Sequence, residues 1–581
     1  MMRRFVAIAS ASEDYSAQIS RSIEYANSAG LSVRIRAEGL AVLASEELAV
    51  RPLKGACGVV IGEVFRRSAT ARTSDHGGTY EEISRTIIDG QAPDEFWGDF
   101  VAIHRSADGS TRFVHSPCGN INLYYLACDD GLLLIASDSA ILLALAKRRR
   151  SLNWAAIAHN LVWDDLSPPE TCIEAVHEIR WGEAGHWRHG RVSVETIWNP
   201  WRYTEAQASI STSEEAVALV RQKLFESIGA RRALAGKLTI DLSGGLDSSI
   251  IAAACAKTGS EPACINLYDP DTEGDERRFA RCVADHLQLR LIEAIPSAEK
   301  VNLDICARAH LPRPYVRSFV QAFDRAALQA ASNFGATGFL NGGGGDSVFC
   351  HLQSSAPVVD ALKSGSRAPS AVRVANEVAR TAQCSIWEVA RRAGRKIFRA
   401  SPTGRFIPNG EFLLPECRDL AETLSSNLPI PSEQPLPGKI EQVHGIFRAL
   451  YNLNGFSRSD HMDGIFPLLS QPLVEACLRI PTWMCVGEGR NRLIARRAMA
   501  SELPPMAMWR TSKGGLGRLQ RDIVRTKREQ IRAKLLDGQL SSQGLIDRSA
   551  IEDELKDDTS YRIENIYRLM RLCDIETWCS A

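Results

Sequence analysis

The feature that most constrains this chain is the run Leu238-Thr-Ile-Asp-Leu-Ser-Gly-Gly-Leu-Asp-Ser-Ser249. An apolar stretch typical of a strand ends at Leu242, two glycines follow, and a helical pattern then begins. Paired glycines let the backbone pass close to a phosphate, and the N–H groups at a helix start attract anions. The run therefore predicts an anion-binding loop. Its expected phosphate contacts are Leu242, Ser243, Gly244, Gly245, Asp247 and Ser248.

This loop lacks the lysine that a P-loop nucleotidase carries. It would instead neutralise a pyrophosphate through N–H groups, hydroxyls and a divalent metal, which suits cleavage between the α- and β-phosphates of ATP. Asp247 is the expected metal ligand, because carboxylates together with substrate phosphates are the usual ligands of Mg²⁺. The alternative, a Gly-Gly turn with a Ser/Asp helix cap, explains the glycines but accounts poorly for the whole run.

Charge and composition narrow the class of protein. The 581 residues carry 69 Lys and Arg against 69 Asp and Glu, which disfavours a groove that tracks nucleic-acid phosphates. No apolar run reaches the roughly 18 residues of a membrane span, and the apolar start is too short for a signal peptide. We expect a cytoplasmic protein without nucleic-acid or membrane partners. Its 15 cysteines form no C-x-x-C pair, so we expect reduced structural thiols.

Two patterns divide the chain near residue 205, which predicts domains over 1–204 and 205–581. Short apolar or β-branched runs bounded by turn residues mark the first part as rich in sheet. These runs are 58–65, 99–104, 122–127 and 132–136. In the second part a helical pattern, a buried strand at 237–242 and another helix alternate. Such alternation predicts a parallel sheet covered on both faces, with its ligand at the carboxyl ends of the strands.

The glycine-paired loop resembles the pyrophosphate loop of the N-type ATP pyrophosphatases. Nearly the whole chain resembles glutamine-dependent asparagine synthetase and its descendants, β-lactam synthetase and the lasso-peptide macrolactam synthetases. The resemblance implies an α/β protein that has two domains and that uses ATP and Mg²⁺. The first would be a degenerate Ntn-type (αββα) glutaminase-like domain, and the second a doubly wound parallel-sheet ATP-pyrophosphatase domain.

Two further segments carry this resemblance and imply site residues. Gly338-Phe-Leu-Asn-Gly-Gly-Gly-Gly-Asp-Ser-Val-Phe349 is similar to the family stretch G-x-G-x-D-E-L-F, which makes Asp346 the second magnesium carboxylate. Ser347 stands where the family has glutamate. Arg510-Thr-Ser-Lys-Gly-Gly515 matches R-x-x-K-x-G, so Lys513 would neutralise charge that develops during phosphoryl or acyl transfer. The remaining implied nucleotide contacts are Leu267, Gly342, Gly343 and Arg492, and Arg492 replaces a family lysine.

A third segment, His461-Met-Asp-Gly-Ile-Phe-Pro-Leu-Leu-Ser470, resembles the family block V-E-A-R-V-P-F-L-D. Register through Pro467 places Asp463 where the family has an active-site glutamate. This carboxylate could deprotonate an attacking amine or orient an acyl adenylate. An ordinary helix-cap aspartate is the alternative.

The first domain is expected to have lost its glutaminase. The relatives expose a cysteine nucleophile at their start, whereas this sequence begins Met1-Met2-Arg3 and has its first cysteine at position 57. Val60-Ile-Gly-Glu-Val-Phe65 resembles the family's N-G-E-I-Y, with Ile61 in place of the oxyanion-hole asparagine. The amine would then be free ammonia or a group that the substrate carries.

The resemblance implies an AMP-forming amide ligase, which adenylates a carboxylate and lets an amine displace AMP. We favour a macrolactam synthetase that joins an Asp or Glu side chain of a precursor peptide to its N-terminal amine. That interpretation implies a precursor peptide, a leader-recognition protein and a leader peptidase as partners. The tyrosine of the β-lactam enzymes' Tyr-Glu dyad has no clear counterpart here, since Tyr451 is merely the nearest upstream of Asp463.

A second, weaker reason to favour a macrolactam synthetase is the arginine-rich amphipathic stretch 371–399, which offers a surface for a peptide or partner protein. Such a stretch is more often a packed, solvated scaffold helix. The alternatives are a β-lactam synthetase-like or ammonia-dependent amide ligase, and a non-catalytic peptide-binding scaffold.

Overall fold

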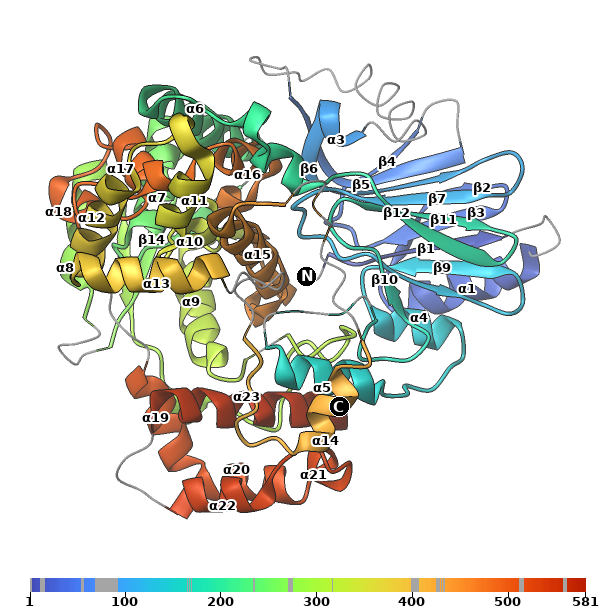
Figure 1. The fold of residues 1–581 in the computed structure, drawn as a ribbon. Coiled ribbons are helices and arrows are strands. Elements are labelled where there is room, and N and C mark those ends of the chain that lie inside the picture. Colours follow the sequence, from blue (N-terminus) through green and yellow to red (C-terminus); the bar gives the residue numbers. More distant parts are fainter. Residues whose placement is uncertain are drawn as a thin grey trace.

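Three sheets organise the molecule, two antiparallel sheets in the first part and one parallel sheet in the second (Figure 1). The computed structural model describes residues 3–10, 16–53, 57–67, 92–164, 166, 168, 170–232, 236–269, 275–315, 317–398, 407–424, 429, 431, 434–510, 517–556 and 562–581. Within these residues no helix combines the length and apolar character that crossing a membrane requires. All 15 cysteines are free thiols, most of them buried, as predicted.

The two antiparallel sheets have six strands each. The first runs in the order β10 (His177–Glu178), β8 (Tyr124–Ala127), β9 (Leu132–Ala136), β1 (Phe5–Ser10), β3 (Leu40–Ala44) and β2 (Ser32–Ala37). The second runs in the order β12 (Arg191–Thr196), β11 (Glu183–Arg188), β7 (Thr111–His115), β6 (Phe96–Arg105), β5 (Cys57–Arg66) and β4 (Val50–Pro52). The four predicted strands correspond to β5, β6, β8 and β9.

The burial of β1 shows how these sheets are layered. Phe5, Ala7 and Ala9 lie in the core between the two sheets, whereas Val6 and Ile8 lie in a core with the helices on the other side. Helices α1 (Ser16–Ser28) and α4 (Ser139–Leu145) pack against this first sheet. A strand covered on both faces is apolar at every position, which hides the period of two that a sequence reader looks for.

The parallel sheet has the order β15 (Leu291–Ala294), β14 (Ala263–Leu267), β13 (Leu238–Asp241), β16 (Gly338–Leu340) and β17 (Asp463–Ile465). Every neighbouring pair is parallel. The packed helices include α6 (Ser213–Arg232), α7 (Leu246–Lys257), α8 (Arg277–Leu287) and α9 (Val320–Phe334). The predicted fold class is therefore confirmed. Strand order reverses between β13 and β16, and at such a switch point ligands bind beyond the carboxyl ends of the strands.

Further helices complete the second part. They are α10 (Gly345–Val348), α11 (Ala356–Ser364), α12 (Ala371–Ala382), α13 (Ile386–Phe398), α15 (Pro437–Asn452), α16 (Gln471–Leu478), α17 (Leu493–Ala498) and α18 (Pro505–Met508). The described part of the arginine-rich stretch 371–399 forms α12 and α13.

A helical group at the end of the chain packs with α5 (Trp154–Val162) and α14 (Pro415–Ala421) (Figure 1). It comprises α19 (Gly517–Thr526), α20 (Arg528–Leu536), α21 (Gln539–Ser542), α22 (Arg548–Lys556) and α23 (Ile563–Ser580). Its apolar residues share one core with the helix-facing residues of β1. Because that core contains residues from both sides of position 205, the two predicted domains are not separate in packing, and the boundary itself stays a prediction.

Buried ion pairs join the two parts of the chain. Arg67 donates to both carboxylate oxygens of Glu475 on α16, at 2.6 and 2.7 Å. Arg313 pairs with Glu178 of β10 at 2.8 Å, and both side chains are buried. Paired and hydrogen-bonded charges of this kind are costly to break, so they fix how the antiparallel sheets sit against the parallel sheet.

Candidate active site

The loop after β13 has the strained, glycine-dependent shape that the sequence predicted. Gly244 has φ +69°, and a Cβ on it would lie 2.5 Å from Cβ of Phe279 and 2.6 Å from the backbone nitrogen of Ala280, both on α8. Gly245 is the N-cap residue of α7, and its N–H donates to Oγ of Ser243 at 3.2 Å. Oγ of Ser243 lies 3.3 Å from Oγ of Ser248. Hydroxyls and helix-start N–H groups thus gather at one bend, as an anion site needs.

The loop after β16 lies directly against this first loop. A Cβ on Gly345 would lie 2.5 Å from Cγ of Asp247, and one on Gly342 would lie 3.1 Å from the backbone nitrogen of Ser248. The N–H of Gly343 donates to Oδ1 of Asn341 at 2.7 Å. Close contact with the first loop therefore requires glycine here. The structure brings Gly342, Gly343 and the first loop together, as predicted.

Two carboxylates from these loops face one cation. Nη1 of Arg492 lies 3.0 and 2.9 Å from the carboxylate oxygens of Asp247, and 2.6 Å from Oδ1 of Asp346. The predicted metal ligands therefore converge on one cationic nitrogen, which is the arrangement a divalent cation between them would also need. Arg492 itself has φ +51°, a left-handed conformation that costs a non-glycine residue about 1 kcal/mol or more. The predicted phosphate contact of Arg492 stays a prediction, since its guanidinium contacts carboxylates here.

The segment that leads to Lys513 begins at the first loop. The side chain of Arg510 is nearly buried, forms an ion pair with Glu276, and lies 3.9 Å above the ring of Phe279. Its Nη1 donates to the carbonyl of Ser243 at 3.5 Å. Lys513 itself lies outside the described residues, so its predicted role stays a prediction. The position of Arg510 brings the start of the R-x-x-K-x-G segment to the phosphate loop.

A buried arginine ties Arg492 to this segment. Arg496 donates to the carbonyls of Asn491, at 2.9 Å, and Arg510, at 3.3 Å. Burial, with the neighbouring charge of Arg492, lowers the pKa of Arg496 to about 10. It stays protonated at neutral pH, because that value still lies well above 7. Arg496 therefore contributes positive charge behind the two carboxylates.

Sequence reasoning missed a second charged network, which lies beneath the loops. Asp241 ends β13 and pairs with Arg458, and it accepts a hydrogen bond from Nδ2 of Asn341 at 2.7 Å. Arg458 also pairs with Asp324 at 3.3 Å and lies 4.0 Å from the ring centre of Phe339. The network fixes β13 against β16 just before their loops. Its one signal in the sequence is an aspartate that closes an otherwise apolar strand.

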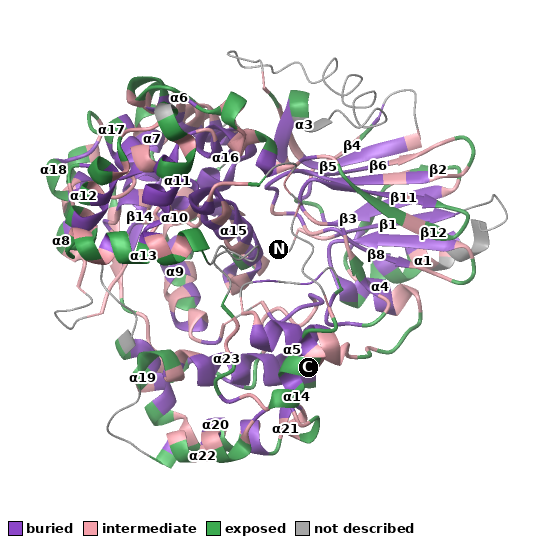
Figure 2. Ribbon diagram, in the orientation of Figure 1, coloured by how far each residue is buried: buried purple, intermediate pink, exposed green. Residues whose placement is uncertain are grey.

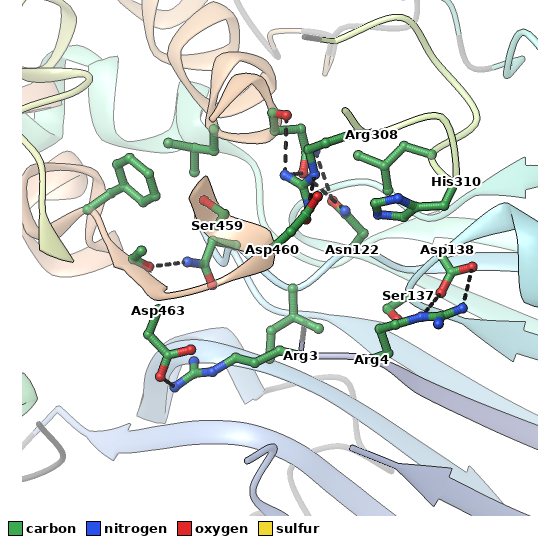
Figure 3. A pocket seen from close by; sticks show the side chains of 17 residues that line it. Arg3, Arg4, Asn122, Ser137, Asp138, Arg308, His310, Ser459, Asp460 and Asp463 are labelled. Carbon is green, nitrogen blue, oxygen red and sulfur yellow. Dashed lines mark hydrogen bonds and ion pairs between the residues drawn. The ribbon is translucent and has the colours of Figure 1, made fainter. Parts of the chain in front are cut away.

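Asp463 lies in a different place from the phosphate loops. It begins β17, at the end of the strand opposite to the loops, and pairs with Gly338 in the sheet register. Its carboxylate lies 2.5 Å from Nη2 of Arg3. Figure 3 shows these two side chains pointing toward each other along a pocket between the antiparallel and parallel sheets. The structure therefore does not group Asp463 with the predicted phosphate contacts.

This pocket is lined by paired charges from both parts of the chain. Besides the pair at Asp463, Arg4 pairs with Asp138 at 2.9 Å, and Arg308 with Asp460 at 3.2 Å. Phe466 lines the pocket, and a Cβ on Gly343 would lie 3.6 Å from its ring. One aromatic ring thus stands between the polar pocket and the second phosphate loop.

Leu267 ends β14 and Leu242 follows β13. Leu242 is buried, donates its N–H to the carbonyl of Ile265 at 2.8 Å, and accepts from Nδ2 of Asn266. Leu267 is partly buried against the core of the parallel sheet. Both residues therefore lie at the carboxyl edge of the sheet, where the sequence predicted them to contact nucleotide.

Comparisons with known proteins place the second part of the chain in a family. A family model described as asparagine synthase matches residues 219–580, a range that contains both glycine loops, Arg492 and Asp463. A search of curated proteins finds no match. Among solved structures, the chain is similar to glutamine phosphoribosylpyrophosphate (PRPP) amidotransferase from B. subtilis complexed with ADP and GMP. The identity is 9% over 58% of this chain and 81% of that chain, and the TM-score of 0.21 carries no argument.

Proposed function

The chain belongs to the asparagine synthase family of ATP-dependent amide-forming ligases, and we propose that it closes a macrolactam in a peptide. An Asp or Glu side chain of a precursor peptide would attack the α-phosphate of ATP, giving an acyl adenylate and pyrophosphate. The N-terminal amine of the same peptide would then displace AMP and form the amide. Adenylation turns a poor acyl electrophile into a good one, and closure within one molecule keeps the two reacting groups together.

The observation that carries the ATP half of this proposal is the convergence of Asp247 and Asp346 at the switch point of the sheet. Their carboxylates face a single cationic nitrogen at 2.6–3.0 Å, so they fit a magnesium ion completed by nucleotide phosphates. When bound, that ion would neutralise phosphate charge during transfer. The chain itself supplies the N–H groups of Gly244 and Gly245, the hydroxyls beside them, and the guanidinium of Arg492.

The second step of the proposal, attack by the amine, rests on the pocket around Asp463. Its carboxylate is about one-third exposed and pairs with Arg3, so an ammonium group of a substrate can reach it. Because it lies at the opposite end of β17 from the loops, it would hold the amine-bearing end of the peptide rather than act at the adenylate itself. Ile61, which is fully buried in β5, offers no hydrogen bond where an oxyanion-hole amide would be needed. An amine brought by the substrate is therefore favoured over ammonia from glutamine.

Tyr451 does not support a β-lactam synthetase-like function. Its ring packs edge-on against Trp181 at 4.9 Å, and burial, followed by the charge of Glu178, raises its pKa to about 12. It is part of the core where the two parts of the chain meet. A precursor peptide, a leader-recognition protein and a leader peptidase remain the partners proposed with the macrolactam.

Mass spectrometry of the reaction products tests this function. The protein would be incubated with ATP, Mg²⁺ and, separately, aspartate with ammonium, a β-amino acid, and a leader-free peptide with an internal Asp or Glu. We expect the peptide alone to lose one water within the same molecule, with one AMP formed per ring. Amide formation only with aspartate and ammonium would instead identify an ammonia-dependent ligase. Failure to bind ATP would favour a scaffold.

A further inference from the structure

Helices α11, α12 and α13 pack on one another and combine positive charge with exposed apolar side chains. Over residues 361–398 the sequence carries eight Lys and Arg against two Glu, a net charge of +6 in a chain whose total is zero. The described residues contain thirteen exposed large apolar side chains, and five of them lie in these three helices. These five are Leu362, Val372, Trp387, Ile397 and Phe398.

The outer face of α13 carries this combination most clearly, and Figure 2 shows exposed residues along this helix. Trp387, Arg391, Arg395 and Phe398 recur at helical spacing and are all exposed, the two aromatic residues to 82% and 89%. The stripe is about 16 Å long, at 1.5 Å per residue. Monomeric proteins seldom expose large aromatic side chains so fully, and Trp and Arg are the residues most enriched at the centres of protein interfaces.

The inner faces of the same helices are already used. Val374, Val378, Val389 and Ala393 are buried in a core that these helices share. The three helices are therefore held together by their own core. The exposed aromatic residues do not belong to that core, and arginines lie between them on the surface. A membrane-binding helix would instead keep its continuous apolar face available for the bilayer.

Local ion pairing leaves much of the positive charge uncompensated. Glu388 accepts hydrogen bonds from both Arg391 and Arg392, and these bonds lower its pKa to about 2. One carboxylate thus serves two guanidinium groups that stay more than half exposed. Arg373 and Arg395 add further exposed cations. A partner with carboxylates would complement this surface, because opposite charges on facing surfaces speed encounter and fix register.

We propose that the outer face of α13 docks an acidic peptide segment that places apolar side chains on Trp387 and Phe398 and carboxylates on the arginines between them. Exposed aliphatic side chains elsewhere on the same helices, Leu362 and Val372, also favour a polypeptide over a nucleic acid, whose outward surface is phosphate. The surface belongs to different elements from the phosphate loops and the pocket at Asp463. The inference therefore does not depend on the macrolactam chemistry.

Binding of a defined probe to the full-length protein tests this surface. The probe is a fluorescent peptide of about 12 residues, which as a helix spans the stripe, with alternating pairs of Glu and Leu. We expect binding that weakens as salt is raised, because exposed charges are screened. Trp387→Ala should weaken binding about tenfold, and Arg391→Glu with Arg395→Glu by about a hundredfold. A matched probe with Lys in place of Glu should not bind.

Two variants elsewhere on the surface serve as controls. Ile563→Ala removes an exposed apolar side chain, and Arg525→Glu reverses an exposed charge on α19. Both should bind the probe as the wild type does, and unfolding midpoints should confirm that all variants fold. Equal binding by Trp387→Ala would overturn the proposal. So would preferential binding of a single-stranded oligonucleotide or of phosphatidylglycerol vesicles in a manner that requires Trp387.

Discussion

The phosphate loops and the pocket around Asp463 differ in how the chain builds them. Each loop is a short continuous segment, 242–248 or 341–346, whose shape is set by glycines that touch the other loop. The pocket instead takes Arg3 and Asp138 from the antiparallel sheets, and Asp460 and Asp463 from residues more than 300 positions later. The two glycine loops are therefore encoded by local stretches of sequence. The pocket instead depends on how the two parts of the chain pack.

The largest effect is expected at the two carboxylates. Asp247→Asn and Asp346→Asn should each lower the rate of substrate-dependent ATP–pyrophosphate exchange by about 10²–10³-fold, because each removes a charge from the cation site. Asp522→Asn changes a partly exposed carboxylate on α19 and should leave the exchange rate unchanged. If both site variants kept an exchange rate within about twofold of wild type, the two loops would not take part in the reaction with ATP.

A smaller effect is expected from filling the bend of the first loop. Gly244→Ala places a Cβ against the backbone of α8 and should weaken ATP binding about ten- to a hundredfold, as measured by calorimetry. Gly335→Ala is a matched control, since Gly335 also has a positive φ, +75°, but nothing lies within 4 Å of the added Cβ. If both variants bound ATP equally well, the close contact with α8 would not shape the site.

Acid should lower the free energy of unfolding through a histidine buried in the antiparallel sheets. Burial, the largest cause, lowers the pKa of His115 on β7 to about 4. In the unfolded chain a histidine takes up its proton near pH 6.5, so the unfolded state binds protons first. The free energy of unfolding should therefore fall as pH drops from about 6.5 to about 4. His115→Gln should flatten this dependence in denaturant titrations, whereas His189→Gln, at an exposed turn, should not.

No effect at all is expected from glutamine. The buried Ile61 provides no side-chain donor for an oxyanion, so added glutamine should neither release glutamate nor increase amide formation. Glutamate release is the direct assay, and ammonium chloride serves as the control nitrogen source. Glutamine-stimulated amide formation would show that the antiparallel sheets still carry an amidase.

The sequence predicted the fold class and the first loop well, because a strand, two glycines and a helix start are local features. It did not predict β1, β2 and β3, since β1 is buried on both faces and lacks alternation. The contact between Asp463 and Arg3 joins residues 460 positions apart and has no local signal. Likewise, Arg492 was expected to contact phosphate, and only the packing of α17 shows that it faces the two carboxylates.

The most direct test of the account follows the oxygen of the substrate acid. A peptide whose Asp or Glu carboxylate is labelled with ¹⁸O would be converted with ATP, and the nucleotide product analysed by mass spectrometry. If the two loops hold the diphosphate of ATP while the acid attacks the α-phosphate, AMP must carry one ¹⁸O per amide formed. ADP with labelled orthophosphate, or AMP without label, would contradict the account.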